Sequence, residues 1–206
     1  VVSDHGVKRM KGAFCINEWL VEEGLLKLKH KPTSIVDLEK ASIDWSETKV
    51  WGWGGYYARI FLNVKGREIQ GKIPPENYES FRDEIVDKLK NITDFEGRKM
   101  ETKIFKPEKI YPVLNGDPPD LMVYFDDLYW RSAGTLGHQT VYLSENDKGP
   151  DDAVHSMDGI FILYDKLGRF KKKKIDGLKI VDVASTILKL MGLSVPKDFE
   201  GKSIMD

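Results

Sequence analysis

The first six residues contain two side chains that could bind a metal ion together. Asp4 and His5 follow two strand-forming valines, and Gly6 comes directly after them. Neighbouring side chains diverge along a strand, but a glycine lets the backbone turn so that they can converge. A carboxylate oxygen and a neutral imidazole nitrogen suit Zn²⁺ or Mn²⁺. Taken alone, the motif favours a simpler interpretation, a turn in which Asp4 caps a backbone N–H and His5 is exposed.

Two other segments change that balance. One is HSMDGIFIL, in which His155 stands four residues before Gly159 and a buried-strand pattern; the other is the carboxyl-terminal IVDVASTILKLMGLSVPKDFEGKSI. With VVSDHG, they occur in the order and approximate spacing of the alkaline phosphatase superfamily. The chain resembles its type I phosphodiesterase and nucleotide pyrophosphatase-like branch.

Further segments make the resemblance more specific. INEWLVEEGLLKLK, FLNVKGREIQGKI and PPDLMVYF are similar to segments of the archaeal and bacterial proteins of this superfamily that are described as predicted phosphohydrolases or phosphomutases. The resemblance covers essentially all 206 residues, and it corresponds to the carboxyl-terminal part of such an enzyme. It implies a substrate that is a phosphate monoester or diester.

The resemblance also implies roles for individual residues. Asp4 and His5 match the Asp-His pair that binds one of two divalent metal ions, and His155 matches the single histidine that binds the other. In the family, two ions roughly 4 Å apart activate a Ser or Thr nucleophile and polarise the phosphoryl group. The donor types indicate zinc or manganese as the two ions of the intact enzyme.

The chain departs from the family pattern in one decisive respect. The nucleophile and the remaining metal ligands come, in the family, from an amino-terminal half that this sequence lacks. We therefore expect weak or partial metal binding and no activity for the chain alone. We also expect exposed strand edges and apolar surface, which a missing half or a second copy in a homo-oligomer would cover.

Two alternatives to a hydrolase segment stay open. One is a phosphomutase segment, which would share the two-metal apparatus and differ in what accepts the phosphoryl group. The other is a non-catalytic binding or assembly module whose metal ligands are remnants. A reading frame upstream of Val1 that encodes a Ser or Thr nucleophile and a DxxxH pattern would favour the enzyme segment.

Arg67 is the candidate residue for binding substrate. It follows Gly66 in an expected loop, where a guanidinium could donate two hydrogen bonds to a phosphate or carboxylate group. The alternative is a surface salt bridge. Other candidates are weaker: His138 is expected to be a hydrogen-bonding histidine, and adjacent Asp126 and Asp127 have no histidine nearby in the sequence to support another metal site.

The helices that would position these residues follow from capping and periodicity. Asn17 is expected to cap a helix over EWLVEE, and Gly24 to end it. Residues 76–92 carry apolar side chains at three- or four-residue steps and predict an amphipathic helix. At IVDVASTILKLMG we expect a strand edge that leads into a helix, with Ser185 standing where the family often has a proline before the Thr that starts it.

The strands complete the expected fold, which is α/β. We expect extended segments at residues 25–29, 49–73, 100–111, 117–125 and 159–164. The aromatic residues of 49–73 are assigned to packing rather than to a stacking platform for a ligand. The fold class is an alkaline phosphatase-like mixed sheet flanked by helices, in part, with an α+β cap-like insertion. Residues 1–10 and 150–206 would belong to the catalytic core, and residues 11–149 would form the inserted cap, which we expect to select the substrate.

Composition excludes several classes of partner. Hydrophobic residues make up 41% of the chain, and 32 basic against 33 acidic residues give a net charge of −1. Such a balance argues against nucleic acid or an anionic membrane as the main partner. No apolar run is long enough to span a bilayer. The single cysteine, Cys15, fits a reducing cytoplasm. The run Lys171–Lys174 is expected to be a solvated loop. The scarcity of glutamine is typical of proteins from thermophiles.

Overall fold

The computed structural model divides the chain into two compact units. It describes residues 1–148, 152–166, 168, 170, 172 and 174–205. Unit 1 contains Val1–Gly6 and Asp158–Asp206, and unit 2 contains Val7–Met157. That the first belongs to a catalytic core and the second is an inserted cap stays a prediction. The expected boundary at residues 149–150 and two members of the lysine run, 171 and 173, lie outside the described residues.

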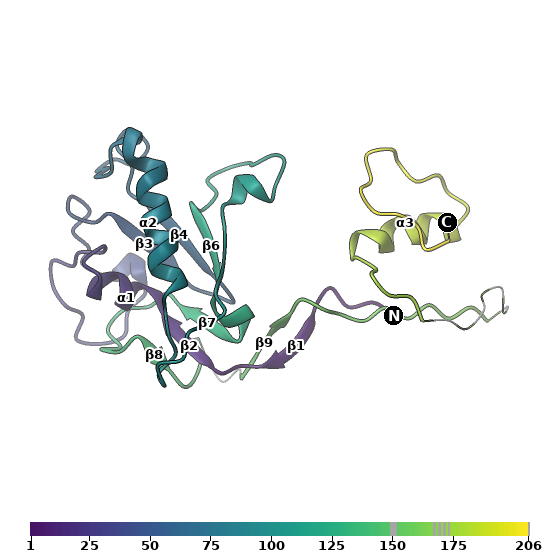
Figure 1. Ribbon diagram of the computed structural model, residues 1–206, viewed down its shortest axis with the longest axis horizontal. Coiled ribbons are helices and arrows are strands. Elements are labelled where there is room, and N and C mark those ends of the chain that lie inside the picture. Colours follow the sequence, from purple (N-terminus) through teal and green to yellow (C-terminus); the bar gives the residue numbers. More distant parts are fainter. Residues whose placement is uncertain (149–151, 167, 169, 171, 173, 206) are drawn as a thin grey trace. The chain divides into compact units, whose positions relative to one another are not determined.

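The main sheet of unit 2 has four antiparallel strands. Their order is β3 (Val50–Trp53), β4 (Ala58–Leu62), β6 (Leu121–Tyr124) and β5 (Lys103–Phe105), and Figure 1 shows α2 running alongside them. Along β3 and β4 the buried residues alternate with more exposed ones, as the period of a half-buried strand requires. The extended character expected of residues 49–73 and 117–125 is confirmed for these strands.

A second sheet of unit 2 has three strands. The buried strand β2 (Gly12–Cys15) pairs in parallel with β7 (Trp130–Ala133) and antiparallel with β8 (Tyr142–Leu143). Strand β1 (Gly6–Arg9) pairs with β9 (Ala153–Ser156), the strand that carries His155.

Helix α1 (Ile16–Glu22) begins differently from the expectation. Asn17 makes no capping hydrogen bond and lies inside the helix, so the predicted N-cap is wrong. Its buried carboxamide donates to the carbonyl oxygens of Gly52 (2.8 Å) and Gly134 (2.7 Å) and accepts from the Gly52 N–H (2.9 Å). The side chain therefore bonds to three backbone groups of other segments instead of capping the helix. Gly24, with φ of +70°, follows the helix end as predicted.

Helix α2 (Tyr78–Lys90) is the amphipathic helix that the periodicity predicts. It buries Arg82, Ile85 and Leu89. Shorter 3₁₀ turns occur at Leu38–Lys40, Pro75–Asn77, Pro107–Lys109 and Phe125–Leu128. No described helix combines the length and the apolar composition needed to cross a bilayer.

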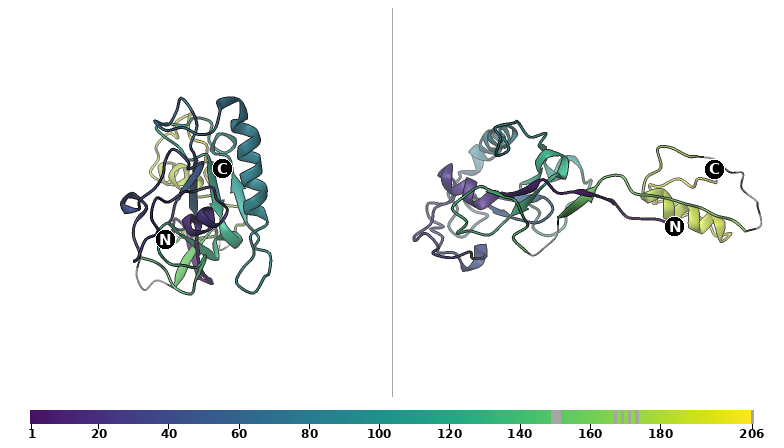
Figure 2. Two further views of the ribbon diagram at one scale, coloured as in Figure 1. Left: turned by 90° about the vertical axis from the view of Figure 1, so that its left-hand side faces the viewer. Right: turned by 90° about the horizontal axis from the view of Figure 1, so that it is seen from below.

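Unit 1 is built around α3 (Val181–Leu190). The helix starts earlier than expected, so IVDV is not a strand edge and Ser185 is an internal residue rather than part of a helix start. The Ser185 hydroxyl donates to the carbonyl of Gly201 (2.8 Å), and the Ile204 N–H donates to Thr186 Oγ1 (3.2 Å). These bonds attach the carboxyl-terminal segment to α3. Figure 2 shows the course of that segment beside the helix.

The remaining part of unit 1 is extended chain. Val2 and Phe161 form an isolated antiparallel bridge, and the Ser3 N–H donates to the Ile160 carbonyl (3.0 Å). The strand expected over 159–164 is thus reduced to this short pairing. Among the described residues of unit 1, the buried side chains are Ser185, Thr186 and Ser203. Its large apolar side chains are half-buried or exposed.

Candidate functional site

Asp4 and His5 lie in contact in unit 1. Asp4 Oδ2 and His5 Nε2 are 3.5 Å apart, and the His5 N–H donates to Asp4 Oδ1 (3.0 Å). The Asp4 side chain is 83% exposed and that of His5 is 40% exposed, so both can be reached from solvent. Gly6, which directly follows the pair, begins β1.

The geometry of this pair fits a shared divalent cation. Two ligands at zinc-like bond lengths and a tetrahedral angle are about 3.4 Å apart, close to the Asp4–His5 separation. His5 Nδ1 is 2.8 Å from the carbonyl oxygen of Gly6. If Nδ1 carries the proton and donates to this carbonyl, Nε2 carries the lone pair that binds metal. A cation held here would take further ligands beyond these two residues.

His155 lies on β9 in unit 2. Its imidazole stacks on the ring of Tyr56, with 3.7 Å between ring centroids and 24° between ring planes. The cation of Arg131 lies over the same tyrosine ring, 4.3 Å from its centroid. The structure thus places one predicted ligand in an aromatic stack, while the other two form a pair in unit 1.

Among the residues that the structure describes, no group of three or more His, Cys, Asp or Glu side chains is arranged to hold a metal ion. The three residues assigned as ligands therefore stay predictions, with the Asp4–His5 pair as the part whose geometry fits.

Arg67 forms an ion pair with Asp120, a residue that directly precedes β6. Its two terminal nitrogens donate to the two carboxylate oxygens at 2.7 and 2.8 Å, and Nε donates to Glu68 (3.0 Å). The Arg67 side chain is 43% exposed, whereas that of Asp120 is 3% exposed. A substrate phosphate would compete with the Asp120 and Glu68 carboxylates for these N–H donors. Substrate binding by Arg67 stays a prediction.

Asp120 is the residue of this cluster that the sequence reasoning missed. Its carboxylate also accepts from the Leu62 N–H (2.6 Å) and the Tyr78 hydroxyl (2.6 Å). An aspartate directly before a buried apolar run, in PPDLMVY, was the available signal, because a buried charge needs partners. In the structure, Arg67 is the basic residue that pairs with it.

The hydroxyl of Tyr78 should make stability depend on pH. Burial and the hydrogen bond to Asp120 raise the pKa of Tyr78 to about 12. The folded state therefore holds this proton at a pH where an unfolded tyrosine, with a pKa near 10, releases it. The contribution is fully present below about pH 10 and is lost as pH rises through about 12. We expect the free energy of unfolding to fall more steeply between pH 10 and 12 in the wild type than in Tyr78→Phe; parallel curves would contradict this assignment.

The other candidates have structural roles. Thr135 Oγ1 lies 2.7 Å from His138 Nε2, so His138 is the hydrogen-bonding histidine that was expected. Asp126 binds Lys11 (2.6 Å), and Asp127 binds Lys103 (2.6 Å). These acidic residues, both with positive φ, thus fix a tight turn through lysine pairs.

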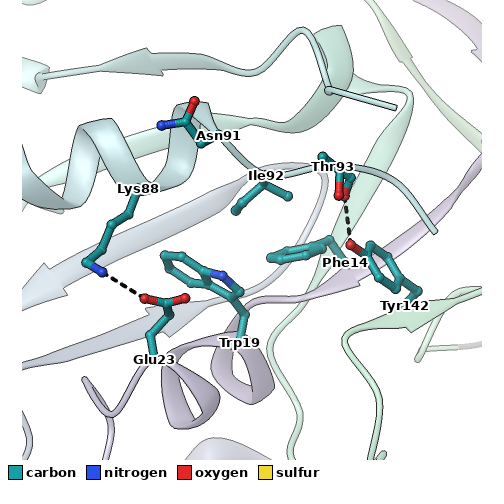
Figure 3. Close-up of a pocket in the computed structure, with 8 residues that line it drawn as sticks. All are labelled: Phe14, Trp19, Glu23, Lys88, Asn91, Ile92, Thr93 and Tyr142. Atoms are coloured by element: carbon teal, nitrogen blue, oxygen red, sulfur yellow. Dashed lines mark hydrogen bonds and ion pairs between the residues drawn. The ribbon is translucent and has the colours of Figure 1, made fainter. Parts of the chain in front are cut away.

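Unit 2 also contains an aromatic pocket of about 380 Å³. Its lining, drawn in Figure 3, consists of Phe14, Trp19, Glu23, Lys88, Asn91, Ile92, Thr93 and Tyr142. Lys88 pairs with Glu23 (2.9 Å), and the Tyr142 hydroxyl donates to the Thr93 carbonyl (2.8 Å). These two contacts lie between lining residues, whereas the Asn91 side chain bonds to Asp87 and Lys99 outside the lining. The pocket includes none of the predicted ligands.

Comparison with known proteins gives one match. The family model described as type I phosphodiesterase / nucleotide pyrophosphatase matches residues 1–151. No curated protein and no solved structure matches the chain. The family match confirms the resemblance over residues 1–151, which include Asp4, His5 and Arg67. His155 and the carboxyl-terminal motifs lie beyond the matched residues, and every residue role stays a prediction. The mixed α/β architecture agrees with the expected fold class.

Proposed function

The chain belongs to the type I phosphodiesterase / nucleotide pyrophosphatase family, and on this basis we propose that it supplies metal ligands to a phosphoester hydrolase. Asp4 and His5 bind one divalent ion, and His155 binds a second. The observation that carries this proposal is the Asp4–His5 pair, 3.5 Å apart, with His5 Nδ1 next to the Gly6 carbonyl. Bound divalent ions would polarise the phosphoryl group and stabilise the leaving oxygen.

The finer assignments follow from the donor types. A carboxylate and imidazoles favour Zn²⁺ or Mn²⁺ as the ion. The substrate class is a phosphate monoester or diester, and a phosphomutase would use the same ligands. Burial raises the pKa of Cys15 to about 12, so this thiol stays protonated and unreactive near neutral pH. A cytoplasmic location is part of the proposal, because a single cysteine forms no disulfide within the chain.

We further propose that unit 1 works in contact with polypeptide that supplies the nucleophile and the remaining ligands. Exposed apolar side chains on and around α3 support this. They include Ile180, Ile187 and Met191, which are 55%, 49% and 68% exposed. Burying such side chains favours association by about 25 cal/mol per Å². The same surface supports the second candidate function, an assembly module that forms homo-oligomers without catalysis.

An activity assay separates these functions. The chain, alone and with the polypeptide encoded directly upstream of Val1, is tested with Zn²⁺ or Mn²⁺ against a chromogenic phosphomonoester and a phosphodiester. We expect no turnover by the chain alone and metal-dependent turnover by the mixture, lost in His155→Ala and in Asp4→Ala. Loss of at least 100-fold is expected because each ligand acts directly on the reacting centre.

Two controls complete the assay. His30→Ala changes an exposed histidine that carries no assigned role, and its mixture should keep full turnover. A mixture without turnover, together with self-association of the chain, would refute the hydrolase and favour the assembly module. Turnover by the chain alone that His155→Ala abolishes would refute the dependence on added polypeptide.

A further inference from the structure

The loop between β5 and β6 contains Asn115 followed by Gly116. Every residue from 108 to 117 is exposed. The Tyr111 N–H donates to the Pro107 carbonyl, and the next backbone N–H along the chain that donates to another backbone group is that of Asp120. Because backbone amides that lack a partner in the protein bond to water, this stretch of the loop is held by solvent.

An asparagine followed by glycine can rearrange without an enzyme. The glycine nitrogen attacks the carbonyl carbon of the asparagine side chain, so that a C–N bond forms, the bond to the side-chain nitrogen breaks and ammonia leaves. Water then opens the resulting five-membered succinimide at one of its two carbonyl groups, which gives aspartate or isoaspartate. Water is the only co-reactant, and nothing is oxidised or reduced. The result is a covalent modification that replaces a neutral amide with a carboxylate.

The structure leaves both reacting groups of this pair free to meet. In the described part of the chain, neither the Gly116 N–H nor the Asn115 carboxamide makes a hydrogen bond. A Cβ built on Gly116 would have nothing within 4 Å, so no neighbouring segment blocks the attack. Its φ of +70° lies in the left-handed region, which glycine enters without strain. The loop can therefore rearrange without breaking any contact of the fold.

The other five asparagines of the chain each lack one of these conditions. Asn17 and Asn63 are buried, and their carboxamides donate to backbone carbonyl oxygens. The other three are each followed by a residue whose Cβ obstructs the attacking nitrogen: Asn77, Asn91 and Asn146. Exposure, free amides and a following glycine thus coincide at one asparagine.

We propose that Asn115 is a site of spontaneous deamidation, at which the folded protein forms a succinimide and then aspartate or isoaspartate. The new carboxylate lies two residues before Asp117 and changes the formal net charge from −1 to −2. Isoaspartate also adds a methylene group to the backbone of the loop. Because no backbone hydrogen bond of the sheet involves this stretch, β5 and β6 should stay paired after the modification.

Peptide mapping by mass spectrometry tests the proposal on the full chain, incubated at neutral and at mildly alkaline pH. The measured quantity is the fraction of Asn115 that has exchanged its NH₂ group for OH, and enzymatic methylation of isoaspartate counts that product separately. The variants are Gly116→Ala, which adds a Cβ to the attacking residue, and Asn115→Gln, which would need a larger ring. A synthetic peptide of residues 110–118 gives the rate without the fold.

The expected result is selective for one asparagine. Asn115 should convert before Asn77 and Asn91, and within about 3-fold of the rate in the peptide, a difference in activation free energy of about 0.7 kcal/mol. Gly116→Ala should convert at least about 10-fold more slowly, which corresponds to about 1.4 kcal/mol. An acidic band in isoelectric focusing should grow with time in the wild type and be absent in Asn115→Gln. The denaturation midpoint of the modified chain should equal that of the unmodified chain.

Each contrary result overturns a stated part of the proposal. Conversion of Asn115 no faster than that of exposed Asn77 would overturn the site. A rate in the folded chain far below that in the peptide would show that the fold restrains the loop. Conversion of Gly116→Ala at the wild-type rate would exclude attack by an unobstructed glycine nitrogen. An acidic band that persists in Asn115→Gln would place the charge change at another residue.

Discussion

Replacing Asp120 with alanine is expected to lower the free energy of unfolding by about 3 kcal/mol. The carboxylate is 3% exposed and accepts from Arg67, the Leu62 N–H and the Tyr78 hydroxyl. Its removal leaves the Leu62 N–H, at the end of β4, without its acceptor. Because Arg67 is 43% exposed, its charge can regain water, which keeps the expected loss at the lower end of the range for broken buried pairs.

Denaturant unfolding of the wild type and three variants measures this effect. Asp117→Ala is the matched control, since Asp117 is exposed and lies three residues earlier in the same segment. It should change the free energy of unfolding by no more than about 0.5 kcal/mol. Arg67→Ala should also lower the free energy of unfolding, because it leaves the buried carboxylate without its cation, although the Tyr78 and Leu62 donors remain. Equal costs for Asp120→Ala and Asp117→Ala would show that the cluster adds nothing to stability.

The same cluster shows how far the sequence leads. The sequence predicts that the Arg67 guanidinium donates two hydrogen bonds to a planar anion. In the structure that anion is the Asp120 carboxylate. Sequence alone left open whether that anion was a substrate or a carboxylate of the chain, because the two partners are 53 residues apart. Local chemistry identified the donor, and the fold decided which acceptor reaches it.

Elements set by local pattern were predicted best. Helix α2 followed from an apolar period over several turns, and Gly24 from its freedom to adopt positive φ. Asn17 was misassigned because capping is a weak local preference, worth about 1 kcal/mol, and three buried backbone groups of distant segments compete for its carboxamide. The start of α3 was misplaced because Val181 and Val183 favour strands by propensity alone.

In the candidate site, too, contacts between sequence neighbours were predictable and contacts between distant segments were not. Asp4 and His5 are adjacent, so their convergence could be argued from Gly6 and is present in the structure. The stack of His155 on Tyr56 joins segments far apart in the chain, and no periodicity points to it. The glycines in WGWGGYY were the available signal, because glycine inside a strand pattern indicates a close backbone approach.

That close approach predicts the second large effect. Gly54→Ala should lower the free energy of unfolding by about 3 kcal/mol, because the new Cβ would lie 2.3 Å from the Gly134 nitrogen and 2.5 Å from the Ser132 carbonyl oxygen. Both are backbone atoms of β7 or the chain just after it, so no side chain can move aside. The loop must shift instead, and Tyr56, two residues later, should shift with it.

Gly66→Ala is the control that separates close approach from backbone strain. Gly66 has φ of +83° and nothing within 4 Å of a built Cβ, so alanine there meets open space and should cost only about 1 kcal/mol. Denaturant unfolding gives both free energies, and the ring signal of His155 reports whether the stack has moved. We expect that signal to shift in Gly54→Ala and to stay in place in Gly66→Ala. A cost for Gly54→Ala no larger than that for Gly66→Ala would contradict the backbone contact that fixes Tyr56.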